Sequence, residues 1–105
     1  MAKFLLAYKG GGMGATPEQQ QKAMDAWMAW FGSLGEAVVD QGSPFSPACS
    51  TVSSNGTVSE GSASPLSGYT IISAGSLAEA SDKAKGCPVL ATGGSIEVFE
   101  ALEMG

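Results

Sequence analysis

Two carboxylates stand out among the residues that could do chemistry. Asp25 lies inside an apolar helical segment, and Asp40 lies just before a turn that contains glycine and proline. A carboxylate held partly buried beside such a turn can act as a general base. The alternative roles are structural: Asp40 accepts hydrogen bonds from backbone amides of the turn, and Asp25 is exposed on the helix. We take Asp40 as the candidate catalytic residue and Asp25 as a candidate ligand contact.

Four aromatic side chains are the other candidates. Trp27 and Trp30 lie three residues apart in the same helical segment. Together with Tyr8 and Tyr69 they could line an apolar pocket for an aromatic or other flat ligand, and core packing is the alternative role. We expect Trp30 to be the pocket residue, because a helix face wide enough for both tryptophans leaves one at its rim.

The residue types that are absent narrow the chemistry further. The chain has no histidine, and its five basic residues are all lysine, so it lacks the commonest general base and metal ligand and the bidentate phosphate clamp. Cys49 and Cys87 are too few for a zinc site, and we expect both to be small, partly buried apolar residues. The net charge of −5 disfavours nucleic acid and anionic membranes as partners. We expect no metal and no cofactor.

A glycine-rich segment, residues 10–14, connects the first expected strand to the first expected helix. Its Gly10, Gly12 and Ala15 fit a relaxed dinucleotide fingerprint, but the chain has no second parallel half to complete such a site. The remaining possibilities are a loop over the mouth of a site, a weak anion seat at the helix start, and a plain connection.

The expected helices and strands follow from the spacing of apolar residues and from the residues that begin and end helices. Residues 3–9 alternate as a strand whose two faces are both apolar. Thr16, Pro17 and Gln19 mark a helix start with a capping box. Glycines 32 and 35 disfavour helix, but the spacing of Leu34 and Val38 favours continuation of the helix towards Asp40, with Gly42 as the stop.

The second half of the chain predicts a hairpin, a strand, a helix and a strand. Residues 49–53 and 57–59 flank an Asn-Gly pair, a strong hairpin signal. The hairpin is followed by a strand over 69–74, by a helix that begins with a second capping box at Ser76, and by a strand over 95–102. This order predicts an α+β, ferredoxin-like βαββαβ sandwich with an extra β-hairpin, an antiparallel sheet and two helices on one face.

The 105 residues fit a single domain, residues 1–105. The first apolar stretch is too short to span a membrane and lacks a cleavage pattern, so we expect a cytoplasmic protein without membrane contact. The apolar second face of the first strand must be covered, and a second subunit would cover it. We therefore expect a homodimer.

Short motifs from most of the chain resemble one known family. Residues 68–72, 76–80, 87–90 and 93–98 are similar, in order and spacing, to the C-terminal signature of the YCII-related family, including its DGPF-type members. Residues 27–31 and 34–35, with Asp40, Gly42 and Pro44, resemble its first-helix region. The resemblance implies a dimeric α+β barrel, a class that includes small enzymes acting on aromatic or lactone substrates.

Two functions of different classes follow as hypotheses. In the first, the protein binds or transforms a small, mostly apolar metabolite in a pocket near the dimer interface. In the second, it is a non-catalytic dimeric module that regulates or scaffolds another protein. A deep pocket holding a carboxylate would favour the first, and a filled core with solvated acids would favour the second.

Overall fold

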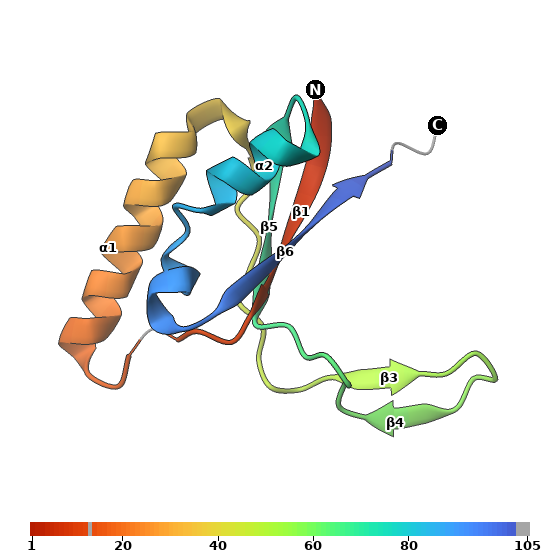
Figure 1. Cartoon of the computed structure of the whole chain (residues 1–105). Coiled ribbons are helices and arrows are strands. Elements are labelled where there is room, and N and C mark those ends of the chain that lie inside the picture. The colour runs from red at the N-terminus through yellow and green to blue at the C-terminus, as the bar shows by residue number, and fades with distance from the viewer. Residues whose placement is uncertain (13, 103–105) are drawn as a thin grey trace.

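The fold is an antiparallel sheet with two helices on one face (Figure 1). The computed structural model describes residues 1–12 and 14–102. The sheet order is β2-β5-β1-β6, and every pair of neighbours is antiparallel. The elements are β1 (Ala2–Lys9), α1 (Pro17–Leu34), β2 (Val38–Asp40), β5 (Gly68–Ala74), α2 (Leu77–Ala84) and β6 (Ser95–Ala101). This α+β arrangement is compatible with a ferredoxin-like fold.

Helix α1 begins as the sequence predicts and ends earlier. The Thr16 side chain accepts a hydrogen bond from the Gln19 amide, and the Gln19 side chain accepts from the Thr16 amide, so the capping box is confirmed. The predicted continuation towards Asp40 is wrong. Gly35, at a φ of 57°, ends the helix, and its amide donates to the carbonyl of Phe31.

The segment expected to continue the helix forms a short 3-10 helix, Gly35–Ala37, and then the edge strand β2. Val38 pairs with Ile72, and Asp40 pairs with Ile71 across a register shift. β-Branched residues pack well on a pleated surface. The valines at 38 and 39 therefore suit an edge strand, although Val38 also has the spacing of the helix.

Strands β3 (Ser50–Val52) and β4 (Val58–Glu60) form a separate two-stranded antiparallel sheet. Figure 1 shows this hairpin projecting sideways from the end of the main sheet. All six of its strand residues are exposed. Strand β5 therefore pairs with β1 and β2 in the main sheet, and the hairpin lies outside that sheet.

The core lies between the sheet and the helices. Phe4, Leu6 and Ile72 are almost completely buried, and Trp30 packs with them. Cys87 is also buried, as expected, whereas Cys49 is exposed beside β3, so the expectation of two partly buried cysteines was wrong for Cys49. Within the described residues, no helix is long and apolar enough to cross a membrane.

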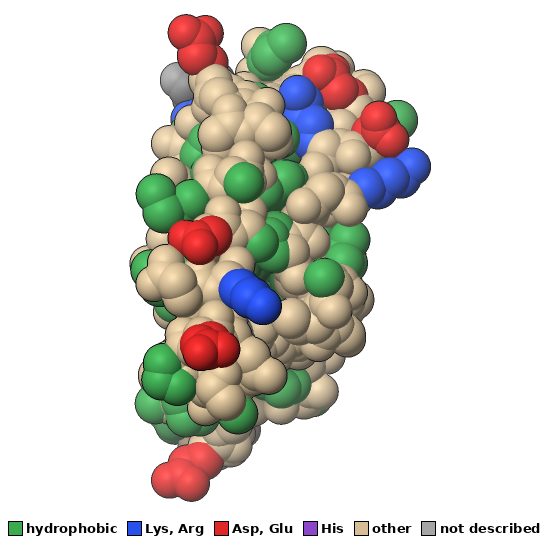
Figure 2. Space-filling view, turned by 90° about the vertical axis from the view of Figure 1, so that its left-hand side faces the viewer, with side chains coloured by type: hydrophobic (Ala, Val, Ile, Leu, Met, Phe, Trp, Pro, Cys, Tyr) green, Lys and Arg blue, Asp and Glu red, His purple; other side chains and the backbone are tan. Residues whose placement is uncertain are grey.

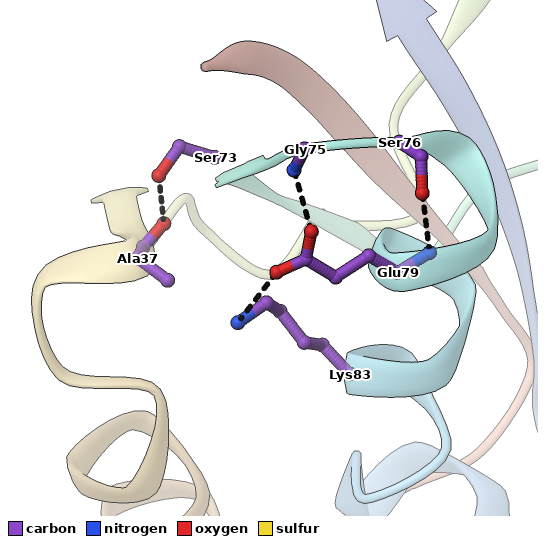
Figure 3. Close-up of polar contacts among 6 residues, drawn as sticks. All are labelled: Ala37, Ser73, Gly75, Ser76, Glu79 and Lys83. Carbon is purple, nitrogen blue, oxygen red and sulfur yellow. Dashed lines mark hydrogen bonds and ion pairs between the residues drawn. The ribbon is translucent and has the colours of Figure 1, made fainter.

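Helix α2 is anchored at its start by polar contacts (Figure 3). The Ser76 hydroxyl accepts a hydrogen bond from the Glu79 amide at 3.1 Å, and the Glu79 carboxylate accepts from the Gly75 amide at 2.7 Å. Lys83 lies one turn further along, 3.8 Å from the same carboxylate. A carboxylate in the first helical turn also complements the helix dipole, so this end of α2 is well fixed.

Replacing Gly42 with alanine should destabilise the fold strongly. Gly42 has a φ of +75°, and an added Cβ would lie 1.7 Å from the carbonyl oxygen of Tyr69. Gly56 is the matched control, because its φ of +86° is similar and its Cβ would meet open space. We expect Gly56→Ala to cost roughly 1 kcal/mol of unfolding free energy from backbone strain and Gly42→Ala at least about 2 kcal/mol more. Equal losses in denaturant unfolding would contradict the close approach.

Candidate functional site

A cavity of about 810 Å³ lies between α1 and the sheet and is open to solvent. Its walls come from α1, from the strands β1 and β5, and from the loops that follow β1 and β2. Residues that line the cavity include Tyr8, Trp27, Phe31, Gly32, Gln41 and Thr70. Cavities that hold small ligands have about this volume.

Aromatic rings form one continuous wall of the cavity. The ring of Trp27 meets that of Tyr8 edge to face, with centroids 5.3 Å apart, and packs against Phe31 at 5.8 Å. Met24 and Met28, on the same side of α1, extend this wall towards solvent and are half or more exposed. Figure 2, which views the molecule from the side of α1, shows hydrophobic side chains among the charged ones on this surface.

The hydroxyl of Tyr8 is held by a buried hydrogen-bond chain. It donates to the Thr70 hydroxyl at 2.6 Å, and that hydroxyl donates to the carbonyl of Gln41 at 3.0 Å. Burial raises the pKa of Tyr8 well above its ordinary value, so the phenol stays protonated near neutral pH. Tyr8 therefore fixes the base of the cavity and is not suited to act as a base there.

The two tryptophans exchange the roles expected of them. Trp27 is half-buried and lines the cavity, whereas Trp30 is 6% exposed, and its indole N–H donates to the carbonyl of Lys83 at 3.2 Å. The expectation that Trp30 is the pocket residue is wrong for this cavity. Trp30 borders only a shallower groove between α1 and the segment after α2. The two indole rings remain in edge-to-face contact, with centroids 5.8 Å apart, and the offset of about 60° between residues three apart turns Trp27 towards the cavity and Trp30 towards the core.

Neither candidate aspartate lines the cavity. Asp25 is exposed on α1 and accepts a hydrogen bond from the Gln21 side chain at 2.9 Å. Asp40 is exposed at the end of β2, where its carboxylate accepts from the Gly42 amide at 2.8 Å. The partly buried general base considered for Asp40 is therefore contradicted, and the turn-capping alternative is what the geometry shows. The strand places Asp40 on the sheet edge, away from the helix end where it was expected.

Tyr69 lies between the cavity and the far face of the sheet. It contributes to the cavity lining, and its neighbour in β5, Thr70, faces the core. The Tyr69 hydroxyl lies 3.5 Å from the Asp40 carboxylate, and its ring packs against that of Phe45 at 5.8 Å. Tyr69 therefore helps to build the rim, while the phenol itself points to the sheet edge.

The glycine-rich loop closes another part of the rim. Gly10, Gly11 and Gly12 line the cavity, and the Gly12 amide donates to the Thr92 hydroxyl at 3.2 Å. Gly11 has a φ of +73°, and a Cβ there would lie 2.7 Å from Val89. The loop thus needs glycine for its backbone angles and its close packing. Met13, in the same loop, lies outside the described residues.

Several lining residues were not among the sequence candidates. Met24, Met28 and Phe31 lie on the same helix face as Trp27, at the three- and four-residue spacing that brings side chains together. That stripe was a usable signal. No sequence pattern marked Gln41 and its neighbours as lining residues, because their place at the cavity depends on the pairing of β2 with β5.

Because Cys87 is buried, the stability of the protein should fall as the pH rises into the alkaline range. Burial raises the pKa of its thiol above the ordinary value. The folded state therefore holds this proton more tightly than the unfolded chain, and stability falls as the pH rises above the pKa of the unfolded thiol. We expect the unfolding free energy to fall less between pH 8 and pH 10 in Cys87→Ala than in the wild type. The exposed Cys49 is the control, and Cys49→Ala should follow the wild type. Identical pH profiles for all three proteins would refute the assignment.

The site as a whole is apolar, aromatic and uncharged. Among its described lining residues none is Asp, Glu or Lys, and the groups that titrate are the tyrosines. Within residues 1–12 and 14–102, no group of three or more metal-ligating side chains could hold an ion. Neither a scan against protein-family models nor a search of curated proteins found a match for this chain.

Proposed function

We propose that the protein binds a small, flat, mostly apolar and uncharged molecule in the cavity beneath α1. The observation that carries the proposal is the aromatic wall of Tyr8, Trp27 and Phe31 along a cavity of about 810 Å³. Aromatic rings pack favourably edge to face or offset against a flat ligand. An ionised ligand would lose its hydration in this cavity without meeting an opposite charge among the described lining residues.

The same geometry favours binding over acid–base catalysis. A general base must reach the proton that it abstracts, and both candidate aspartates lie outside the lining. The deeply buried titratable group among the described lining residues is the Tyr8 phenol, which keeps its proton and donates a hydrogen bond to the Thr70 hydroxyl. The ligand-binding form of the first hypothesis is therefore the one we propose.

We further propose that the protein is a homodimer formed through the open face of its sheet. We define this open sheet face by Leu5, Tyr69, Ile71 and Phe99. Leu5 lies in register with Ile71 on one side and with Phe99 on the other, which gives an apolar row across three strands. Phe99 is 50% exposed. A dimeric α+β barrel of the YCII-related type, with an extra hairpin, would cover this row, and the sheet order is compatible with it.

Narrowing the cavity should weaken ligand binding without removing any contact. Gly32 lines the cavity, and a Cβ there would meet nothing within 4 Å, so Gly32→Leu places a side chain in the ligand space. Ala29→Leu is the control, because Ala29 borders the shallow groove instead. With the uncharged fluorophore N-phenylnaphthylamine as probe, we expect saturable binding that Gly32→Leu weakens at least about tenfold and Ala29→Leu leaves unchanged.

A charged probe tests the polarity of the site. The anionic fluorophore anilinonaphthalene sulfonate should bind at least about tenfold more weakly than the uncharged probe, because its sulfonate finds no cation in the described lining. Equal affinity for the two probes, or binding that Gly32→Leu does not affect, would overturn the proposed function.

The proposed dimer predicts a mass close to twice the chain mass of 10.5 kDa. Sedimentation equilibrium at micromolar concentration measures it directly. Phe99→Asp should shift the protein towards monomer, because a carboxylate would be buried at one end of the apolar row, on β6. A wild type that is folded and monomeric would overturn the dimer.

A further inference from the structure

Three side-chain hydroxyls of the cavity lining donate their protons to backbone carbonyls. The Ser67 hydroxyl donates to the carbonyl of Gly10 at 2.9 Å, and the Thr92 hydroxyl donates to that of Val89 at 3.1 Å. The Thr70 hydroxyl is used in the same way, as described above. A hydroxyl has one proton to donate and two lone pairs that accept. With these bonds in place, the three hydroxyls can meet a ligand only as acceptors.

Ser67 carries the hydroxyl that is best placed to accept a hydrogen bond from a ligand. Thr70 is fully buried, and its hydroxyl already accepts from Tyr8. Thr92 is exposed, and its hydroxyl already accepts from the Gly12 amide at 3.2 Å. Ser67 is half-buried, and its hydroxyl accepts no hydrogen bond from the described residues. Within the described part of the chain, both of its lone pairs therefore remain available.

Ser67 also lies next to the aromatic wall of the cavity. Its amide donates to the carbonyl of Tyr8 at 2.7 Å, and the next residue, Gly68, pairs with Tyr8 across β1 and β5. Tyr8 is in turn the ring that Trp27 meets edge to face. A hydrogen-bond acceptor thus lies at the Tyr8 end of the wall.

Most donors of the described cavity lining are either engaged or exposed to water. The amides of three lining glycines, residues 12, 35 and 42, already donate to groups of the protein. The amides of residues 10–11 and the side chains of Gln41 and Ser43 can donate, but these residues are exposed, so water competes for them. The half-buried end of the cavity therefore offers an acceptor rather than a donor.

We propose that the ligand of this cavity is a neutral aromatic molecule with an O–H or N–H group that donates a hydrogen bond to the hydroxyl of Ser67. The inference rests on the proposed binding of a flat, uncharged molecule and names the polar group of that molecule. Phenols, anilines and aromatic N–H heterocycles belong to this class. Ketones, esters and lactones without a donor do not, because their oxygen would face the lone pairs of Ser67.

The test compares two probes with the same ring system. At pH 7 the O–H of 2-naphthol is protonated and can donate, whereas 2-methoxynaphthalene has no donor. We expect the wild type to bind 2-naphthol about fivefold more tightly in isothermal titration calorimetry, because one neutral hydrogen bond contributes about this factor. 2-Methoxynaphthalene is the more apolar of the two, so a cavity without this hydrogen bond would favour it.

Ser67→Ala removes the acceptor and keeps the backbone of the residue. We expect it to weaken the binding of 2-naphthol about fivefold and to change the binding of 2-methoxynaphthalene less than about twofold. Ser33→Ala is the matched control, because the Ser33 hydroxyl also donates to a backbone carbonyl, that of Trp30 at 2.6 Å, but borders the shallow groove. Ser33→Ala should leave both affinities unchanged, and thermal melting verifies that both variants are folded.

The outcomes separate this inference from the proposed function. A wild type that binds 2-methoxynaphthalene at least as tightly as 2-naphthol, with both weakened by Gly32→Leu, would overturn the donor and keep the binding site. A Ser67→Ala variant that retains the preference for 2-naphthol, or that weakens both probes equally, would also overturn the donor. A wild type that binds neither probe would overturn the proposed function and this inference together.

Discussion

The buried hydroxyl of Tyr8 is the constraint from which the site follows. A phenol enclosed by apolar side chains must have a hydrogen-bond partner, and Thr70 supplies it at 2.6 Å. Thr70 passes a hydrogen bond to the carbonyl of Gln41, so β1, β5 and the loop after β2 are tied at one point. That point fixes the base of the cavity. The ring of Tyr8 then stands where Trp27 of α1 can meet it.

Helix α1 covers the sheet only in part, and this incomplete covering produces the cavity. Trp30 is the buried side chain of the helix, and it fixes the helix to the carbonyl of Lys83 at the end of α2. On the side of Trp27 a space remains between the helix, β5 and the loop after β2. The space there is lined by aromatic and methionine side chains. Methionine is flexible and polarizable, so such a wall adapts to apolar ligands of different shapes.

The molecule has two kinds of apolar surface, the cavity and the open sheet face. The cavity lies on the helix side of the sheet, whereas the open sheet face and the hairpin lie on surfaces that the helices do not cover. The proposed ligand site and the proposed dimer interface therefore share Tyr69 and otherwise use different named residues. They meet only at residues 43–44 and 67–69, where the rim of the cavity leads into the hairpin connections.

The sequence alone determined the features that depend on local spacing. The capping box at Thr16 fixed the start of α1, the alternation of Phe4, Leu6 and Tyr8 identified the core side of β1, and the absence of histidine and arginine restricted the chemistry. The remaining features depend on contacts between residues far apart in the chain. Val38 has both helical spacing and β propensity, and its pairing with Ile72 selects the strand. That strand leaves Asp40 exposed at the sheet edge. The rotation of α1 over the sheet places Trp27 at the cavity and Trp30 in the core, because long-range packing sets which side of a helix with a wide apolar face is covered.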